Sequence, residues 1–232
     1  MLALQALRLV PTTCHLCGES DAHDVPNLCP ECRHQLPEIE QSCTICSQPV
    51  DDDTSICVSC IKQTPTYDNS TTVYEYKKPL DVLFNRLKHH RDITVASTFA
   101  HLLAEKILHA NKPLPDMIVP IPLNWKRQLS RGFNQSQCIA MLVAGRIGVP
   151  VNTKVLTRMM NTASQQGLSR SERLKNLDRC FHADMSVRDK HIALLDDVVT
   201  TGATMEAAAT ALYLRGTASI SAWSIAKVPD PT

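Results

Sequence analysis

The stretch I-A-L-L-D-D-V-V-T-T-G-A-T, which runs from Ile192 to Thr204, decides the fold of this chain. Four apolar residues predict a buried strand; two acids, two further apolar residues and a turn of small residues follow, and a helix is expected over 204–215. At the carboxyl end of a parallel strand, such a turn exposes backbone N–H groups and the positive end of a helix dipole. This order of elements predicts a phosphate-binding turn in an α/β protein.

Two adjacent carboxylates give this turn a second property. Asp196 and Asp197 can accept hydrogen bonds from the vicinal hydroxyls of a ribose, while small residues let the backbone approach a phosphate and threonine hydroxyls add donors. The expected phosphate- and ribose-binding residues are Asp196, Asp197, Val198, Val199, Thr200, Thr201, Gly202, Ala203 and Thr204. The nucleotide patterns G-x-x-x-x-G-K-[ST] and G-x-G-x-x-G are absent, which argues against an ATPase and a dehydrogenase. The alternative is an ordinary buried strand followed by a capped helix.

Strand and helix patterns alternate through the rest of the chain after residue 65. Strands are expected at 71–76, 115–120, 151–158, 180–183, 192–195 and 219–225. Helices are expected at 79–88, 93–109, 135–146 and 204–215. This alternation predicts a parallel sheet flanked by helices.

The first sixty residues carry a different pattern, in which eight of the ten cysteines form four C-x-x-C pairs. The pairs are Cys14 with Cys17, Cys29 with Cys32, Cys43 with Cys46, and Cys57 with Cys60. Each C-x-x-C turn points two thiolates at one metal, so we expect two structural Zn²⁺ sites of four cysteines each. The spacing alone does not decide whether consecutive pairs share a metal or the pairs interleave; we expect consecutive pairs. Disulfides are the alternative, which a cytosolic setting disfavours. So short a segment cannot easily fold alone, and zinc would supply much of its folding free energy.

Length and composition set the domain organisation. A chain of 232 residues that is 44% hydrophobic can bury one α/β core and carry a small appendage. Thr64-Pro65-Thr66 marks a linker, so we expect a Cys-rich zinc-binding module at 1–65 and a second domain at 66–232. The first ten residues lack the features of a signal peptide or a membrane span. A cytoplasmic protein without membrane insertion is therefore expected.

The charge pattern suggests an anionic partner for the second domain. The net charge is only +1, yet residues 1–60 hold nine acidic and two basic residues, whereas residues 120–180 hold ten basic and two acidic ones. A basic segment attracts the phosphates of a metabolite or of a nucleic acid, although it can also be a solvated face. A shorter basic run from Lys77 to Arg91 has the same two interpretations. Aromatic residues make up only 4% of the chain, which argues against a dedicated base-stacking module.

The motif at 192–204 resembles the signature of type I phosphoribosyltransferases. Further residues resemble the ComF/GntX family of competence and DNA-utilisation proteins, and the paired cysteines fit that family too. The residues that carry this resemblance are Val119-Pro120-Ile121-Pro122-Leu123, Arg127, Arg131-Gly132-Phe133-Asn134-Gln135, Arg158, Gln165, Gln166, Leu168, Arg173 and Asn176.

The resemblance implies a type I phosphoribosyltransferase fold that binds phosphoribosyl pyrophosphate together with Mg²⁺. Arg127, Arg131 and Asn134 would face the pyrophosphate, and the stretch 159–176 would be a mobile loop that carries Arg170, Arg173 and Lys175. Asp196 and Asp197 would orient the ribose and stabilise positive charge in any transfer reaction.

The resemblance also implies a bacterial protein that serves DNA uptake or the use of DNA as a nutrient. Phosphoribosyl pyrophosphate is the expected ligand, with single-stranded DNA and the DNA-uptake machinery as further candidate partners. Three alternatives stay open at this point. They are an active phosphoribosyltransferase in nucleobase salvage, a non-catalytic sensor of phosphoribosyl pyrophosphate, and a non-catalytic scaffold that binds single-stranded DNA.

Overall fold

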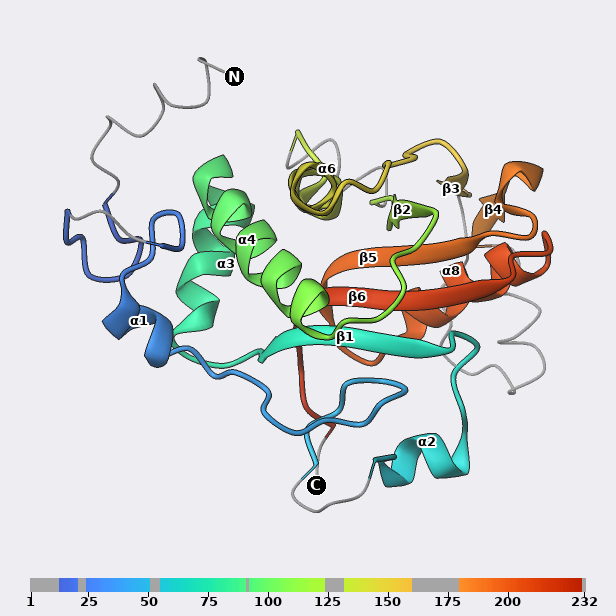
Figure 1. Cartoon of the computed structure of the whole chain (residues 1–232), viewed down its shortest axis with the longest axis horizontal. Helices are drawn as coiled ribbons and strands as arrows, with labels where there is room; N and C mark the ends of the chain where they lie inside the picture. Colours follow the sequence, from blue (N-terminus) through green and yellow to red (C-terminus); the bar gives the residue numbers. More distant parts are fainter. Residues whose placement is uncertain are drawn as a thin grey trace.

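A four-stranded parallel sheet forms the centre of the molecule (Figure 1). The structure is a computed structural model that describes residues 13–20, 24–50, 55–90, 92–123, 132–159 and 180–230. The strands are β1 (Asn69–Glu75), β2 (Met117–Pro120), β5 (His191–Val199) and β6 (Ser219–Lys227). Their order is β1-β6-β5-β2, and each neighbouring pair is parallel. The predicted parallel α/β sheet is confirmed.

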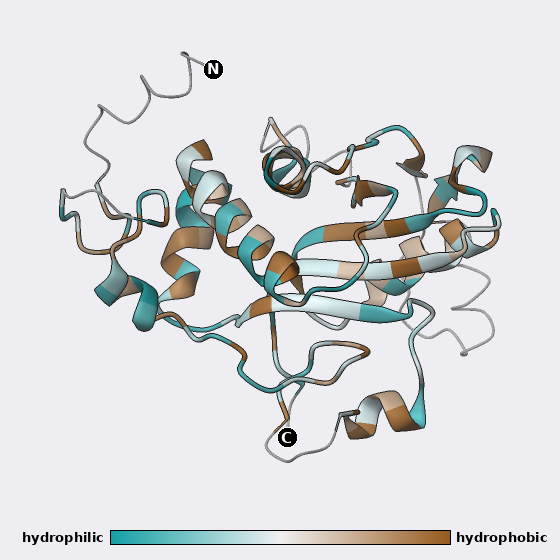
Figure 2. Ribbon diagram, viewed as in Figure 1, coloured by the Kyte–Doolittle hydropathy of each residue, from teal (hydrophilic) through white to brown (hydrophobic). Residues whose placement is uncertain are grey.

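Helices cover both faces of this sheet. The helices α3 (Leu80–His89), α4 (Ile93–His109) and α6 (Gln135–Ile147) lie on one face, and α8 (Ala203–Tyr213) lies on the other (Figure 1). Strand β5 contributes side chains to the apolar cores on both faces of the sheet, because successive side chains of a strand point to opposite faces. Ala193 and Leu195 pack with α3, α4 and α6, whereas Ile192 and Leu194 pack with α8. The central part of β5 is accordingly apolar (Figure 2).

Two short strands stand apart from the main sheet, which corrects one expectation. Strand β3 (Leu156–Arg158) pairs antiparallel with β4 (Phe181–Ala183), and the 3-10 helix η2 (Met185–Val187) leads on to β5. A strand was expected over the whole of 151–158. Instead Val151 makes a single bridge to Ile118, because a turn follows it in which the side chain of Asn152 accepts a hydrogen bond from the backbone N–H of Lys154 at 3.0 Å.

The cysteine-rich segment forms two small units that lie at different places on the domain. The first contains α1 (Pro30–His34) and packs beside α3 and α4, where Cys14 and Leu28 join the same apolar cluster as Phe99. The second contains α2 (Val58–Lys62) and lies next to the edge strand β1, on the side away from β6 (Figure 1). Its buried cysteines form a separate small cluster. The boundary between residues 65 and 66 stays a prediction.

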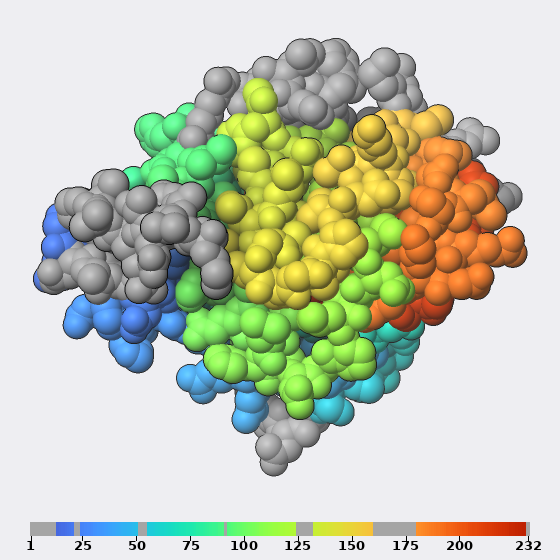
Figure 3. Space-filling view, turned by 45° about the horizontal axis from the view of Figure 1, so that its top comes forward, coloured from blue at the N-terminus to red at the C-terminus, as the bar shows by residue number. Residues whose placement is uncertain are grey.

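Figure 3 shows one face of the molecule, on which α4, α6 and residues 148–159 form a continuous surface between the first cysteine unit and β4. Within the described ranges, no helix combines the length and the apolar character that a membrane crossing requires.

Candidate functional site

The two cysteine units repeat one local structure. In each, the first C-x-x-C pair lies in a tight turn, where Gly18 N–H donates to Cys14 O at 3.0 Å and Ser47 N–H donates to Cys43 O at 2.9 Å. Gly18 and Ser47 both have positive φ, at 80° and 56°. The second pair lies at a helix start, since Cys29 is the N-cap of α1 and Cys57 that of α2. This duplication did not follow from the cysteine spacing alone.

The thiols of each unit converge on one point. The four Sγ atoms of Cys14, Cys17, Cys29 and Cys32 lie within 4.8 Å of one another, and so do those of Cys43, Cys46, Cys57 and Cys60. Two sulfur pairs are 3.7 and 3.6 Å apart. A tetrahedral Zn²⁺ with Zn–S bonds of about 2.3 Å places its sulfurs about 3.8 Å apart, so the geometry fits zinc. The expected joining of consecutive pairs is confirmed.

Hydrogen bonds from backbone N–H groups stabilise the thiolate form of the first cysteine in each unit. Burial alone would raise the pKa of Cys14, but hydrogen bonds from the backbone at Cys17, Cys29 and Leu16 outweigh it and lower this pKa to about 6. The same balance lowers the pKa of Cys43 to about 7. In contrast, burial and then the neighbouring thiols raise the pKa of Cys60. A cation at the centre is therefore needed before all four thiols of a unit can ionise.

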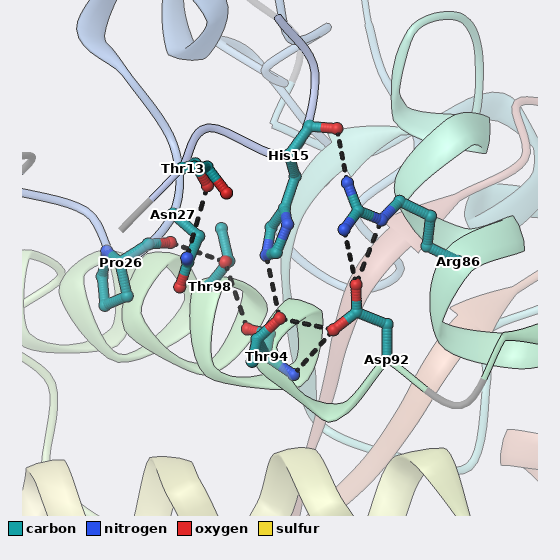
Figure 4. Close-up of polar contacts among 8 residues, drawn as sticks. All are labelled: Thr13, His15, Pro26, Asn27, Arg86, Asp92, Thr94 and Thr98. Carbon is teal, nitrogen blue, oxygen red and sulfur yellow. Dashed lines mark hydrogen bonds and ion pairs between the residues drawn. The ribbon is translucent and has the colours of Figure 1, made fainter. Parts of the chain in front are cut away.

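Arg86 joins the first cysteine unit to the helical layer (Figure 4). Its Nη1 donates to the carbonyl oxygen of His15 at 2.8 Å, while Nε and Nη2 donate to Asp92 Oδ2 at 3.1 and 2.7 Å. Nearby, the hydroxyl of Thr98 donates to the carbonyl oxygen of Pro26 at 2.6 Å. Arg86 belongs to the basic run that we expected either to contact DNA or to form a helix face, and its guanidinium is engaged within the molecule.

The acidic pair lies on strand β5 itself, which corrects the expectation that the strand ends at Leu195. Strand β6 continues beside β5, with Asp196 opposite Ser224 and Val199 opposite Lys227. Strand β2 ends earlier, since its last partner pair joins Pro120 to Leu195. The long strand β6 therefore extends β5 past Leu195. On the side of β2, β5 has no strand partner from Asp196 onward.

Asp196 faces the start of α6. Its Oδ1 accepts hydrogen bonds from Ser136 Oγ at 2.8 Å and from the backbone N–H of Asp197 at 2.9 Å. Burial, followed by the charge of Asp197, raises the pKa of Asp196 to about 7, against the effect of these hydrogen bonds. The two carboxyl groups thus differ in environment, and Asp196 holds its proton more strongly than a free aspartic acid.

Asp197 has a cationic partner that the sequence reasoning did not place here. Lys88 Nζ lies 2.9 Å from Asp197 Oδ2, and these side chains are only 19% and 15% exposed. The same ammonium lies 4.9 Å from the centre of the Phe84 ring. The sequence contains one indication of this position. Lys88 follows Phe84 by four residues, which places both on the same, buried face of α3.

The turn after β5 presents an open helix start. Gly202 is the N-cap of α8 with a φ of 74°, and no side chain caps this helix. The backbone N–H of Ala203 has only a 3.5 Å contact with Thr201 Oγ1. Thr200, Thr201 and Ala203 are exposed. The backbone donors that bind phosphate at a helix start are therefore accessible.

Comparison with known proteins places these sites in a family. Residues 6–61 match the double zinc ribbon domain family, so the two cysteine units are the first and the second zinc ribbon. The chain is 32% identical to the DNA utilization protein YhgH of Salmonella typhi, over 94% of this chain and 98% of that protein. The chain belongs to the ComF/GntX family. Competence protein F of Haemophilus influenzae is 30% identical, over 86% of this chain and 90% of that protein. Competence protein ComFC of Bacillus subtilis is 28% identical, over 91% and 93% respectively.

Among solved structures, the chain is similar to a glutamine phosphoribosylpyrophosphate amidotransferase from B. subtilis. The identity is 18%, the match covers 57% of this chain and 27% of that one, and the TM-score is 0.42. The sheet order and the strand–turn–helix geometry of the chain itself agree with the type I phosphoribosyltransferase fold that its family membership implies.

Not all predicted site residues of this ComF/GntX protein lie in the described ranges. Asn134 does, and it is the N-cap of α6: its Oδ1 accepts from Gln137 N–H at 3.3 Å and its Nδ2 donates to Ile121 O at 2.9 Å. Its predicted contact with pyrophosphate stays a prediction. Outside the described residues lie Arg127, Arg131, Arg170, Arg173 and Lys175.

Proposed function

We propose that this chain binds phosphoribosyl pyrophosphate with Mg²⁺ at the carboxyl end of β5 and acts in DNA uptake or in the use of DNA as a nutrient. The observation that carries the ligand is the junction of the acidic pair on β5 with the uncapped start of α8. The biological role rests on the relatives named for DNA utilization and competence. These names do not favour nucleobase salvage or a pure DNA-binding scaffold.

Each part of the proposed site has one task. The carboxylates of Asp196 and Asp197 accept hydrogen bonds from the ribose hydroxyls, and the backbone of Thr200–Thr204 donates to the 5-phosphate. Mg²⁺ is held chiefly by the oxygens of the ligand. Arg127 and Arg131 supply forked donors to the pyrophosphate, and Asn134 is a further proposed contact to it.

The remaining residues bear on a transfer reaction. Such a reaction at this site displaces pyrophosphate from the anomeric carbon through an oxocarbenium-like state. Asp196 and Asp197 then stabilise the developing positive charge, and the loop that carries Arg170, Arg173 and Lys175 closes to exclude water. The proposal itself concerns binding, which a sensor and an enzyme share.

The two cysteine sites bear on the cell compartment. The two structural Zn²⁺ sites together require eight reduced thiols, and disulfides replace such thiols in oxidising compartments. We therefore assign the protein to the cytoplasm, where phosphoribosyl pyrophosphate and incoming single-stranded DNA are both accessible.

The test is calorimetric titration of the full-length, zinc-loaded protein with phosphoribosyl pyrophosphate and Mg²⁺, before and after addition of single-stranded DNA. We expect binding to the unchanged protein and none to the double variant Asp196→Asn/Asp197→Asn with its zinc content intact. Asp189→Asn makes the same chemical change at an exposed position and serves as the control.

The titration separates the alternatives. Equal affinity of the double variant and the control would refute the assignment of the carboxylates. A protein that binds DNA but no phosphoribosyl pyrophosphate would instead be a scaffold on this fold.

A further inference from the structure

A cleft of about 370 Å³ lies between the second zinc ribbon and the start of α8. Ser59, Cys60 and Gln63 of the ribbon form one wall, and Thr201–Ala203 of the phosphate turn form another. The two segments are about 140 residues apart in sequence. The second zinc ribbon and the proposed phosphate turn therefore line the same cleft.

Lys227 also lines this cleft, and its side chain is buried without a partner. The residue is 5% exposed, yet among the described residues its ammonium group has no hydrogen bond or ion pair. Its position is fixed, because it is the last residue of the inner strand β6 and pairs with Val199 on one side and Glu75 on the other. Because its Nζ keeps some solvent contact and pairs with no acidic side chain of the described residues, the ammonium is available to an anion that enters the cleft.

Two carboxylates line the cleft but are engaged elsewhere. Glu206 accepts hydrogen bonds from the backbone N–H of Thr66, at 2.9 Å, and from the Thr66 hydroxyl. Asp230 Oδ2 accepts from Ser59 Oγ at 3.1 Å. Neither carboxylate comes within ion-pair distance of Lys227. The contact of Glu206 instead holds the linker at Thr66, and the contact of Asp230 holds the second zinc ribbon at Ser59.

We propose that Lys227 and the start of α8 together bind a phosphate monoester, and that the second zinc ribbon forms the roof of this site. The proposal rests on the proposed function and adds Lys227 and the ribbon to its binding groups. The ammonium supplies a full positive charge where the helix start supplies backbone N–H donors, which is the combination that phosphate prefers. The monoester belongs either to phosphoribosyl pyrophosphate or to a 5′-nucleotide, since both carry the same group.

The experiment is titration of the full-length, zinc-loaded protein with phosphoribosyl pyrophosphate and Mg²⁺, ribose 5-phosphate and thymidine 5′-monophosphate. We expect Lys227→Met to weaken the binding of phosphoribosyl pyrophosphate and ribose 5-phosphate by at least about tenfold, by similar factors, because both lose the same contact. Lys227→Arg keeps the charge and retains most of the affinity. Lys154→Met removes the charge of an exposed lysine and is the matched control.

A separate variant tests whether the second zinc ribbon contributes to the site. Gln63 is exposed at the edge of the cleft, and Gln63→Glu places a negative charge there without altering the buried residues. We expect this variant to weaken all phosphate ligands several-fold, whereas unchanged affinity would exclude the ribbon from the site.

The outcomes distinguish this proposal from the proposed function. If Lys227→Met binds every ligand as the unchanged protein does, while Asp196→Asn/Asp197→Asn loses phosphoribosyl pyrophosphate, the lysine site is wrong and the proposed function stands. If the unchanged protein binds none of the three ligands, both fail. Binding of thymidine 5′-monophosphate that depends on Lys227 but not on the acidic pair identifies the nucleotide as the source of the monoester.

Discussion

Lys88 Nζ lies 2.9 Å from Asp197 Oδ2, and this ion pair joins the end of α3 to the end of β5. It joins two features that lie far apart in the sequence, a basic run at 77–91 and an acidic pair at 196–197. Because both side chains are largely buried, the lysine neutralises a charge that would otherwise be costly inside the protein. The helix is therefore positioned by the same carboxylate that we assign to ribose binding.

The first prediction concerns this ion pair. Lys88→Met should lower the free energy of unfolding by about 2–3 kcal/mol, because it leaves Asp197 buried without a cation. Lys77→Met is the control, since Lys77 pairs with Glu75 at the surface and its loss should cost less than about 1 kcal/mol. Urea unfolding measures both. Adding Asp197→Asn to Lys88→Met should restore part of the loss, and a double variant no more stable than Lys88→Met would contradict the coupling.

The second prediction concerns the pH dependence of stability. The folded-state pKa of Asp196 is about 7, above the value of about 3.9 for an unfolded chain. The folded protein therefore keeps a proton that the unfolded chain releases, so this contribution is fully present below about pH 4 and is lost as the pH rises through 7.

Asp196→Asn removes that loss, because an amide does not titrate. We expect the variant to be more stable than the unchanged protein at pH 8, on the order of 2–4 kcal/mol, and to differ less from it at pH 5. Urea unfolding at the two pH values, with Asp189→Asn for comparison, is the measurement. An equal effect at both pH values would mean that Asp196 is already ionised in the folded state at low pH.

Local signals explain where the sequence reasoning succeeded. The helix expected at 93–109 has those bounds as α4, because the side chain of Asp92 caps its start and apolar residues follow at helical spacing. The four C-x-x-C pairs likewise predicted two zinc sites, because each such turn supplies two ligands. Their spacing did not decide the pairing, and the structure joins consecutive pairs.

The remaining features depend on contacts between distant segments. The extension of β5 past Leu195 depends on the length of β6, and the pairing of Lys88 with Asp197 depends on where α3 meets the sheet. The approach of the second zinc ribbon to the start of α8 depends on how the linker folds back, with Thr66 bonded to Glu206. No local pattern in the sequence contains this information.

The third prediction concerns the attachment of the first zinc ribbon. Arg86→Met removes the guanidinium that bonds both His15 O and Asp92, and should cost about 2–3 kcal/mol because hydrogen bonds to charged groups are lost. We expect a chelator to extract one equivalent of zinc faster than from the unchanged protein, with the second equivalent unaffected. Arg146→Met is the matched control, because the exposed Arg146 donates to Leu142 O and to Ser97 Oγ of α4, within the helical layer. Equal acceleration of both equivalents would show that the two ribbons are not held independently.

The fourth prediction separates the backbone conformation of the phosphate turn from its function. Gly202 has a φ of 74°, and a Cβ added there would meet nothing within 4 Å. Gly202→Ala should therefore cost about 1–2 kcal/mol in stability, which is the cost of a left-handed backbone for a residue with a side chain. The cost arises from conformation and not from a clash.

A matched glycine makes this prediction sharp. Gly148, the C-cap of α6, has the same φ of 74° and the same open surroundings. Gly148→Ala and Gly202→Ala should lower the melting temperature by similar amounts, whereas only Gly202→Ala should weaken the binding of phosphoribosyl pyrophosphate, because its Cβ enters the space in which the phosphate approaches the backbone. Equal affinity of the two variants for this ligand, measured by calorimetry, would place the phosphate away from the turn.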